Sequence, residues 1–438
     1  MPDEFHTMSA VNYLHAVPHL TTAQTGPLHE IEVHLLERQA KIEQWFRNQW
    51  LSTPAPFYAS VDLRNAGFKL APVDTNLFPG GFNNLNPAFM PLCVQAVQAA
   101  AERICATACR ILLIPESHTR NLFYLENVAT LKTILEQAGF VVRLGSISPE
   151  ITGPTILDTS SGQKLLLEPI ERREDELHIG DYRPCMILLN NDLSGGQPDI
   201  LQGLKQPVVP PPKIGWSHRR KSDHFSYYYK VVREFAELIE IDPWLIDPLF
   251  RKCGKIDFRK REGEDCLAKN VEQLLQQIQQ KYDEYKIDQE PFVIVKADAG
   301  TYGMGILTVR NVDEVRDLNK KQRNKMARIK EGQAVTEVIV QEGVYTFETW
   351  GEKQAVAEPV IYMIDHFVVG GFYRVHTGRG VNENLNAPGM HFEPLAFEET
   401  CTNPDPKMAP DAHPNRFYAY GVIARLALLA ASREIANL

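Results

Sequence analysis

The chain has 438 residues and a formal net charge of −9; 44% of its residues are hydrophobic and 23% are charged. This length allows a large core and two or three structural units. The acidity disfavours nucleic acid as the main partner, because binding to a phosphate backbone requires a basic face. No basic amino-terminal region precedes an apolar core, and no apolar run is long enough to cross a membrane, so we expect a cytoplasmic protein without a membrane partner.

The seven cysteines are odd in number and include no Cys-x-x-Cys pair. This pattern fits neither a disulfide framework nor a zinc site. Cys105 and Cys109 lie one helical turn apart. We interpret them as buried small hydrophobic residues rather than a redox pair, and we expect structural thiols throughout.

Residues 1–27 show no pattern and are expected to form an amino-terminal tail. Apolar residues at heptad-like spacing then predict an amphipathic helix from Leu28 to about Trp50. The segment from Ser60 to Asn86 is dense in small polar residues and contains two glycine-proline turns. We expect a loop-rich segment there, whose polar groups must contact either the protein or a ligand.

A β-α-β unit follows, with a strand at 111–114, a helix at 122–138 and a second strand at 140–144. The handedness rule for such units predicts a parallel, Rossmann-like sheet. Polar residues follow the strand at 111–114, and others follow the strand at 186–189. The carboxyl ends of parallel strands are where open α/β sheets bind ligands, although these residues could equally form turns and helix caps.

Four prolines between Pro207 and Pro212 predict a domain boundary, which divides the chain into the tail at 1–27, a Rossmann-like substrate domain at 28–206 and a second domain at 207–438. Beyond the boundary, three consecutive cations, Arg219, Arg220 and Lys221, open a predicted helix. A packing helix is predicted from Asn270 to Lys286.

The segment from Phe292 to Leu307 is the strongest candidate for a nucleotide site. A buried strand ends at Lys296 and is followed by three glycines, Gly300, Gly303 and Gly305. Glycines let backbone N–H groups approach an anion, and the lysine adds a point charge for phosphate. The spacing matches neither a Walker loop nor the dinucleotide fingerprint, so a simple glycine-rich turn is the alternative.

The basic segment at 317–331 predicts an exposed helix or lid. Strands at 337–340, 355–364 and 367–374 are predicted to form one antiparallel sheet. A polar, glycine-containing loop at 377–389 follows, and the apolar segment at 417–435 predicts a buried helix.

The order of these parts resembles an ATP-grasp ligase, and more closely the glutathione-synthetase-like glutamate–cysteine ligases of proteobacteria. The resemblance covers residues 28–438 and is carried mainly by residues 64–84, 214–224 and 296–305. It implies an α/β (α+β) fold with a Rossmann-like parallel-sheet substrate domain and an antiparallel-sheet ATP-binding domain. It also implies ATP-dependent joining of the L-glutamate γ-carboxyl group to L-cysteine through an acyl phosphate, the first step of glutathione biosynthesis. A homo-oligomer is compatible with this interpretation.

The resemblance implies roles for four sets of residues. The ATP-binding set is Lys221, Lys296, Gly300, Thr301, Tyr302, Gly303, Gly305, Gln341, Glu342 and Val344. Lys296 and Arg374 are the catalytic set, which would offset charge on the transferred phosphoryl group. Mg²⁺ would be held by Asp74, Asn76 and Asp298, in the arrangement of the permuted eukaryotic glutathione synthetases. The amino-acid substrates would contact Arg64, Lys69, Glu116, Arg120, Asn191, Arg374, Asn384 and Asn386.

Two alternatives remain open at this point. A glutathione synthetase or another γ-glutamyl ligase of the same type would keep the ATP residues and differ only in the amino-acid pocket. A non-catalytic nucleotide-binding protein would bind ATP without turnover. Phosphate release from Mg·ATP with each pair of amino acids distinguishes the three.

Overall fold

A computed structural model describes residues 20–21, 27–117, 121–300, 305–327, 334–395 and 416–438. Within these residues the fold is mixed α/β, with four β-sheets and helices packed against them, which confirms the predicted fold class at this level. No helix in the described part of the chain is both long enough and apolar enough to span a membrane.

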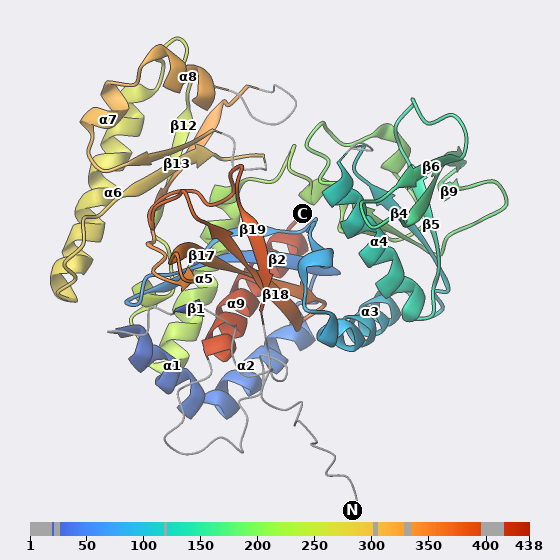
Figure 1. Ribbon diagram of the computed structural model, residues 1–438, viewed down its shortest axis with the longest axis horizontal. Helices are drawn as coiled ribbons and strands as arrows, with labels where there is room; N and C mark the ends of the chain where they lie inside the picture. Colours follow the sequence, from blue (N-terminus) through green and yellow to red (C-terminus); the bar gives the residue numbers. More distant parts are fainter. Residues whose placement is uncertain (1–19, 22–26, 118–120, 301–304, 328–333, 396–415) are drawn as a thin grey trace, which may run out of the picture.

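An antiparallel sheet of seven strands lies at the centre of the molecule (Figure 1). It joins a hairpin from the amino-terminal part of the chain to a hairpin from the carboxy-terminal part. Its strands are β1 (Leu20–Thr21), β2 (Tyr58–Asn65), β3 (Leu70–Asn76), β16 (Thr349–Trp350), β17 (Ala355–Ile364), β18 (Phe367–His376) and β19 (His391–Pro394).

One face of this sheet is covered by helix α9 (Arg416–Ala436), which contacts β2, β3 and β17. The helix is apolar nearly all round and is buried between the sheet and α5 (Lys221–Ile239), as the sequence predicted. Helices α1 (Pro27–Glu37) and α2 (Gln39–Ser52) lie at the same side of the molecule (Figure 1). The predicted single helix at 28–50 is therefore two helices, which meet at Arg38.

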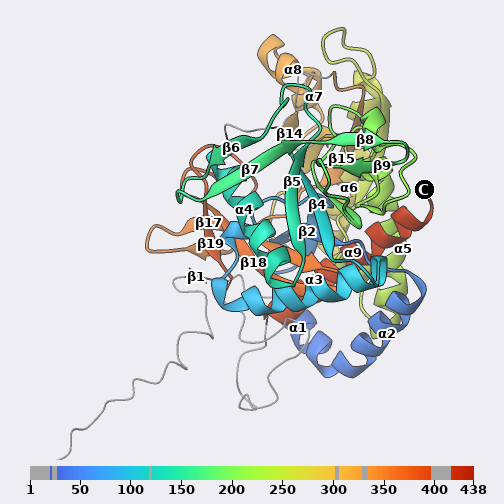
Figure 2. The ribbon, with the colours of Figure 1, turned by 90° about the vertical axis from the view of Figure 1, so that its right-hand side faces the viewer.

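A second sheet has six strands in the order β11-β10-β4-β5-β7-β6, and all its pairs are parallel except β6–β7. The predicted parallel unit is thus present, with helices α3 (Met90–Ile104) and α4 (Leu122–Gln137) packed beside it (Figure 2). Its strands are β4 (Arg110–Pro115), β5 (Val141–Ser146), β6 (Thr155–Asp158), β7 (Lys164–Pro169), β10 (Met186–Asn190) and β11 (Val208–Val209). A small ribbon, β8 (Glu171–Arg173) with β9 (Glu176–His178), extends from this unit.

A third, antiparallel sheet has the order β12-β15-β13-β14. Its strands are β12 (Phe250–Lys255), β13 (Val293–Ala297), β14 (Ile306–Val309) and β15 (Glu337–Glu342). Helix α6 (Glu264–Glu284) packs against it, and α7 (Asp313–Arg316) and α8 (Lys320–Met326) complete this part of the molecule. Helix α6 begins six residues before the predicted helix, and residues 328–331 of the predicted lid lie outside the described residues.

Three predictions about chain organisation are corrected by the sheet pairings. First, β15 does not join β17 and β18, because the chain passes from one sheet to another at Gly343. A Cβ atom at this glycine would lie 2.1 Å from the ring of Phe292, so only glycine permits the passage. Second, residues 60–86 are not mainly loop, since they contain most of β2 and β3. Third, β2 pairs with β17 on one side and with β3 on the other, so this amino-terminal hairpin shares a sheet with carboxy-terminal strands.

Candidate active site

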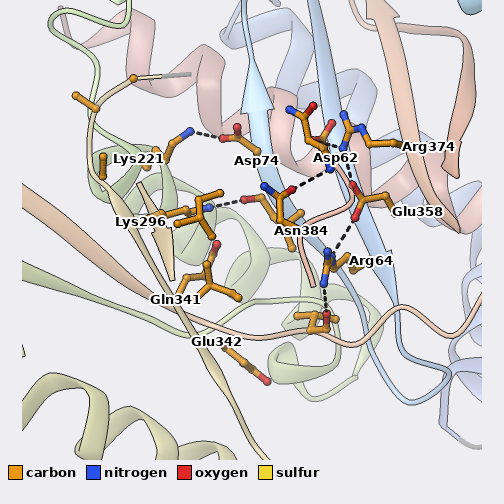
Figure 3. Close-up of a pocket in the computed structure, with 18 residues that line it drawn as sticks. Asp62, Arg64, Asp74, Lys221, Lys296, Gln341, Glu342, Glu358, Arg374 and Asn384 are labelled. Carbon is orange, nitrogen blue, oxygen red and sulfur yellow. Dashed lines mark hydrogen bonds and ion pairs between the residues drawn. The ribbon is translucent and has the colours of Figure 1, made fainter. Parts of the chain in front are cut away.

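A cleft of about 850 Å³, including its open mouth, lies between the central sheet and the four-stranded sheet. Its walls come from β2, β3, β17 and β18 on one side and from β13, β14 and β15 on the other (Figure 3). The loop containing Asn384 and Asn386 and the first residue of α5, Lys221, also line it.

The alternation of side chains along β2 explains why the central sheet can line a polar cleft. Val61 and Leu63 point into the core shared with α9, so Asp62 and Arg64 project from the opposite face. Asp62 faces Asp74 in the neighbouring strand β3. On the same face of the hairpin β17–β18, Glu358 lies opposite Arg374. Five charged residues therefore meet on one face of one sheet.

A chain of ion pairs orders these charges. Nη1 of Arg374 donates to Oδ2 of Asp62 at 3.1 Å and also to Glu358. Nε of Arg64 donates to the other oxygen of Glu358 at 3.1 Å, and the remaining nitrogens of Arg64 donate to the carbonyls of Val344 and Glu383. Glu358 thus fixes two arginines. Arg64 lines the cleft as predicted, but its guanidinium bonds protein groups, which is the geometry of a positioning residue.

Burial shifts the pKa values of Asp62 and Arg374 in opposite directions. Burial raises the pKa of Asp62, and the carboxylates of Glu358 and Asp74 raise it further, although Arg374 acts in the opposite direction. Burial lowers the pKa of Arg374, but the two carboxylates beside it outweigh this effect and raise the pKa well above its ordinary value. Nε of Arg374 is buried and has no hydrogen-bond partner among the described residues. An unsatisfied buried N–H is costly, and a ligand oxygen that reached this group would remove that cost.

The opposite wall presents Lys296 at the end of β13. Its Nζ atom donates to the carbonyl of Val73 in β3 at 2.7 Å, so this lysine bridges the two walls of the cleft. Burial lowers its pKa to about 7, and the nearby ammonium of Lys221 acts in the same direction, while Asp74 opposes them. Ile294 and Gln341 face each other across β13 and β15 beside it. The amide nitrogen of Gln341 is buried and lacks a partner within the described residues.

Asp74 lies where the walls meet. Its Oδ1 atom accepts from Nζ of Lys221 at 2.7 Å. Burial would raise its pKa, but the ammonium groups of Lys221 and Lys296 overcome that effect and hold the pKa well below its usual range. Nζ of Lys221 also lies 4.1 Å from the ring centre of Trp216, a cation–π contact that holds the lysine in place.

The structure assigns Asp298 a different position from the one expected of a metal ligand. This side chain is fully buried, and its carboxylate accepts from the amide and the hydroxyl of Ser222, each at 2.7 Å. Its carbonyl accepts from the amide of Lys221. Asp298 therefore caps the first turn of α5, where a carboxylate is favoured by free N–H groups. Asn76 does not line the cleft either, and its Oδ1 accepts from the amide of Phe78.

The structure also alters the predictions for Glu342 and Lys69. Glu342 lines the cleft as expected, but its carboxylate is directed away from it (Figure 3) and binds Lys69 at 2.7 Å and Nε1 of Trp244 at 3.1 Å. Lys69 is completely buried in this pair and is not exposed to the cleft. The strand pattern explains the direction of the carboxylate, since the side chains of Gln341 and Glu342 must face opposite sides of β15.

The residues expected to bind amino acids at the parallel sheet do meet, but they do not line the cleft. Glu116 follows β4, and its carboxylate accepts from the amide of Asp192 at 3.0 Å. Asn191 follows β10 and donates to the carbonyl of Pro115. This edge of the parallel sheet is linked to the cleft by Trp216. Its amide donates to the carbonyl of Asp192, and its ring contacts Lys221, which lines the cleft. Arg120 lies outside the described residues.

The glycine loop is described only at its ends. Gly300 lines the cleft, and Gly305 lies in the turn that begins β14. Thr301, Tyr302 and Gly303 fall outside the described residues.

Sequence reasoning missed Asp62 and Glu358 as site residues. Both signals were present in the sequence. Asp62 stands in the alternation of β2, and Glu358 is the only charged residue in the apolar strand β17. A buried charge in an otherwise apolar strand requires a partner, and here the partners are the two arginines.

Comparisons with known proteins agree on one family. The family model described as glutamate-cysteine ligase (GshA) matches residues 32–435. A solved structure from Methylobacillus flagellatus KT, provisionally named a gamma-glutamylcysteine synthetase, is 66% identical, with a TM-score of 0.88 over 96% of this chain and 99% of that one. A search of curated proteins finds no match.

Two further structures are much less similar to this chain. A glutathione synthetase-like effector from Globodera pallida is 11% identical, with a TM-score of 0.36 over 84% of this chain and 80% of that one. A D-alanyl-alanine synthetase A from Vibrio cholerae O1 biovar eltor str. N16961 is 12% identical, with a TM-score of 0.35 over 73% and 81%.

Proposed function

Because this chain belongs to the glutamate–cysteine ligase family, we propose that the cleft between the central sheet and the four-stranded sheet is its ATP-dependent catalytic site. The protein is a carboxylate–amine ligase that joins glutamate to cysteine, which confirms the family resemblance and the reaction inferred from the sequence. The ATP-grasp assignment of the fold, the cytoplasmic location and the residue roles below are parts of the proposal.

One observation carries the proposal: two lysine ammonium groups from different elements converge on a single carboxylate at the junction of the walls. Lys221 bonds Asp74, and Lys296 bridges β13 to β3 beside it. Two adjacent cations in a partly dry cleft form a strong site for a polyanion. The triphosphate would lie between these lysines, with the purine between Ile294, Ile306 and the unpaired amide of Gln341.

The donor set of the cleft fits Mg²⁺. Asp62 and Asp74 are register partners, and Asn384 and Asn386 supply amide oxygens nearby. Mg²⁺ prefers hard oxygen ligands and is commonly bound by one or two carboxylates together with substrate phosphates. The described residues contain no cluster of three or more His, Cys, Asp or Glu arranged around one metal, so phosphate oxygens would complete the shell. When bound, the ion neutralises phosphate charge and polarises the phosphorus centre.

The charged side chains of the cleft have distinct roles in the reaction. Lys296 and Lys221 hold the β- and γ-phosphates while a γ-carboxylate oxygen of glutamate attacks the γ-phosphorus and ADP leaves. Arg374, fixed by Asp62 and Glu358, directs its free N–H groups at the transferred phosphoryl group or the acyl oxygen. The amino group of cysteine then attacks the acyl carbon, phosphate leaves and an amide forms. This chemistry depends on positioning and charge neutralisation, and no cysteine of the protein takes part.

The lowered pKa of Lys296 yields a test of this site. With a pKa of about 7, the amine is mostly neutral at pH 8 in the empty protein. A triphosphate placed against it favours the ammonium form, so its pKa rises on binding and the protein takes up a proton. Below pH 6 the amine is already protonated, and uptake disappears.

We therefore expect binding of Mg·ATP at pH 8 to take up most of one proton, roughly 0.8, and almost none at pH 6. Isothermal titration calorimetry in buffers of different ionisation enthalpy measures this number. Lys296→Met should abolish the dependence on buffer at pH 8. Binding heats at pH 8 that are independent of buffer in the native protein would contradict the placement of the triphosphate on this lysine.

A further inference from the structure

Two cysteines from distant parts of the chain meet at the amino-terminal edge of the parallel sheet. Cys109 immediately precedes β4, and Cys185 immediately precedes the neighbouring parallel strand β10. Their Sγ atoms lie 3.8 Å apart, although the residues are 76 positions apart in the sequence. Cys109 is exposed and Cys185 is half-buried. The contact was not expected from the sequence, which placed Cys109 beside Cys105.

The surroundings of this pair favour a reactive thiol. Burial would raise the pKa of the Cys185 thiol, but hydrogen bonds from Cys109 and Arg110, including the Arg110 side chain, lower it below its usual value. The Arg143 guanidinium stacks on the ring of Tyr182 beside the two cysteines but is paired with Glu168, so Arg110 is the cation that acts on Cys185. Reactive thiols lie in partly exposed, electropositive surroundings of this kind, often next to a second thiol that can resolve an intermediate.

A second close pair shows that proximity alone is insufficient. Cys253 and Cys266 also have Sγ atoms 3.8 Å apart. Cys253 is buried, and burial raises its pKa to about 12. This pair therefore has a poor nucleophile at one position and serves as an internal comparison.

We propose that Cys109 and Cys185 form a redox-active dithiol, which low-molecular-weight disulfides oxidise to a Cys109–Cys185 disulfide. The Cys185 thiolate attacks one sulfur of a disulfide RSSR, forms a mixed disulfide and releases one thiolate RS⁻. The thiol of Cys109 then loses its proton and attacks the Cys185 sulfur, which forms the Cys109–Cys185 bond and releases the second RS⁻. Two protein thiols are thus oxidised and one RSSR is reduced to two RSH.

The backbone already permits this bond. Adjacent strands lie about 4.8 Å apart, and the Cys185 amide donates to the Arg110 carbonyl, so the two cysteines occupy a diagonal position across one strand pair. A diagonal offset of one residue between such strands gives a Cα–Cα separation of about 6 Å, which a disulfide can bridge. The pair lies at the amino-terminal edge of the sheet, whereas the residues that adjoin the cleft follow the carboxyl ends of the same strands. The site is therefore distinct from the proposed catalytic cleft.

The test uses the full-length reduced protein and 2-hydroxyethyl disulfide at pH 7.5. Remaining thiols are alkylated in acid-quenched samples, and the digested protein is analysed by mass spectrometry without reduction. We expect a cross-linked peptide joining Cys109 to Cys185 and lacking two hydrogen atoms, while Cys253 and Cys266 remain alkylatable. The melting temperature of the oxidised protein should rise by roughly 5 °C, because the bond closes a long loop.

Single variants identify the order of the two steps. Cys109→Ser should retain the mixed disulfide on Cys185, and Cys185→Ser should react at least about tenfold more slowly because the favoured thiolate is absent. Cys253→Ser is the matched control and should react as the native protein does. A cross-link at Cys253–Cys266 instead, or mixed disulfides on both Cys109 and Cys185 without closure, would overturn the proposal.

Discussion

Lys296→Met lowers the turnover number for ATP-dependent ligation by roughly 1,000-fold or more, while the protein remains folded. The lysine would lose its contact with the transferring phosphates, where single charged donors contribute factors of this size. Methionine is an apolar replacement of similar length, and it removes the Nζ atom that lies over the Phe225 ring. Burial lowers the pKa of Lys296, so the protein gives up a cation that is costly to bury, and the melting temperature should not fall. Steady-state phosphate release and thermal unfolding measure the two effects.

Lys69→Met is the matched control, because it removes another buried lysine from outside the cleft. This change leaves Glu342 without its ion-pair partner in a completely buried site. Loss of one partner from such a pair costs about 3–5 kcal/mol of stability. We expect Lys69→Met to unfold at a lower denaturant concentration, whereas Lys296→Met unfolds normally and is inactive. Normal turnover in Lys296→Met would remove this lysine from the mechanism.

Asp74→Asn has the second-largest expected effect, a loss of roughly 100- to 1,000-fold in turnover with a higher Mg²⁺ requirement. The change removes the carboxylate that pairs with Lys221 and that we assign to the metal. The concentration of Mg²⁺ that gives half-maximal rate should rise at saturating ATP. Titration of Mg²⁺ at fixed free ATP measures it.

Asp298→Asn separates a metal ligand from a structural carboxylate. Asp298 caps α5 through Ser222 and does not line the cleft. Its replacement should lower stability by about 1 kcal/mol, as for other helix caps, and leave the Mg²⁺ requirement unchanged. A shifted Mg²⁺ requirement in Asp298→Asn but not in Asp74→Asn would restore the assignment that the sequence suggested.

Local patterns predicted those elements whose neighbours are close in sequence. The β-α-β unit from Ile111 to Leu144 and the buried helix α9 follow from apolar periodicity alone. The pairing of β2 with β17 could not be predicted, because its register partners are about 300 residues apart and no local signal specifies them. The domain division was limited in the same way, since Pro207 to Pro212 mark a rigid connector but do not specify which strands share a sheet.

Some residues of the site could likewise be predicted from the sequence and others could not. Lys296 was found because it ends a recognisable strand before a glycine loop, whereas Lys221 and Arg374 were assigned through the family resemblance, and the structure brings all three to one cleft. Lys69 and Asp298 were misplaced because a charged residue in sequence looks the same whether it meets a ligand or a buried partner. Only the strand faces and the cap of α5 distinguish the two.

The most direct test of the central claim is a crystal structure with Mg²⁺ and a non-hydrolysable ATP analogue. We predict that the triphosphate lies between Lys221 and Lys296, that the metal contacts Asp74, and that Asp298 remains bonded to Ser222. Density for the nucleotide at the carboxyl ends of β4 and β10, beside Glu116 and away from both lysines, would contradict the account.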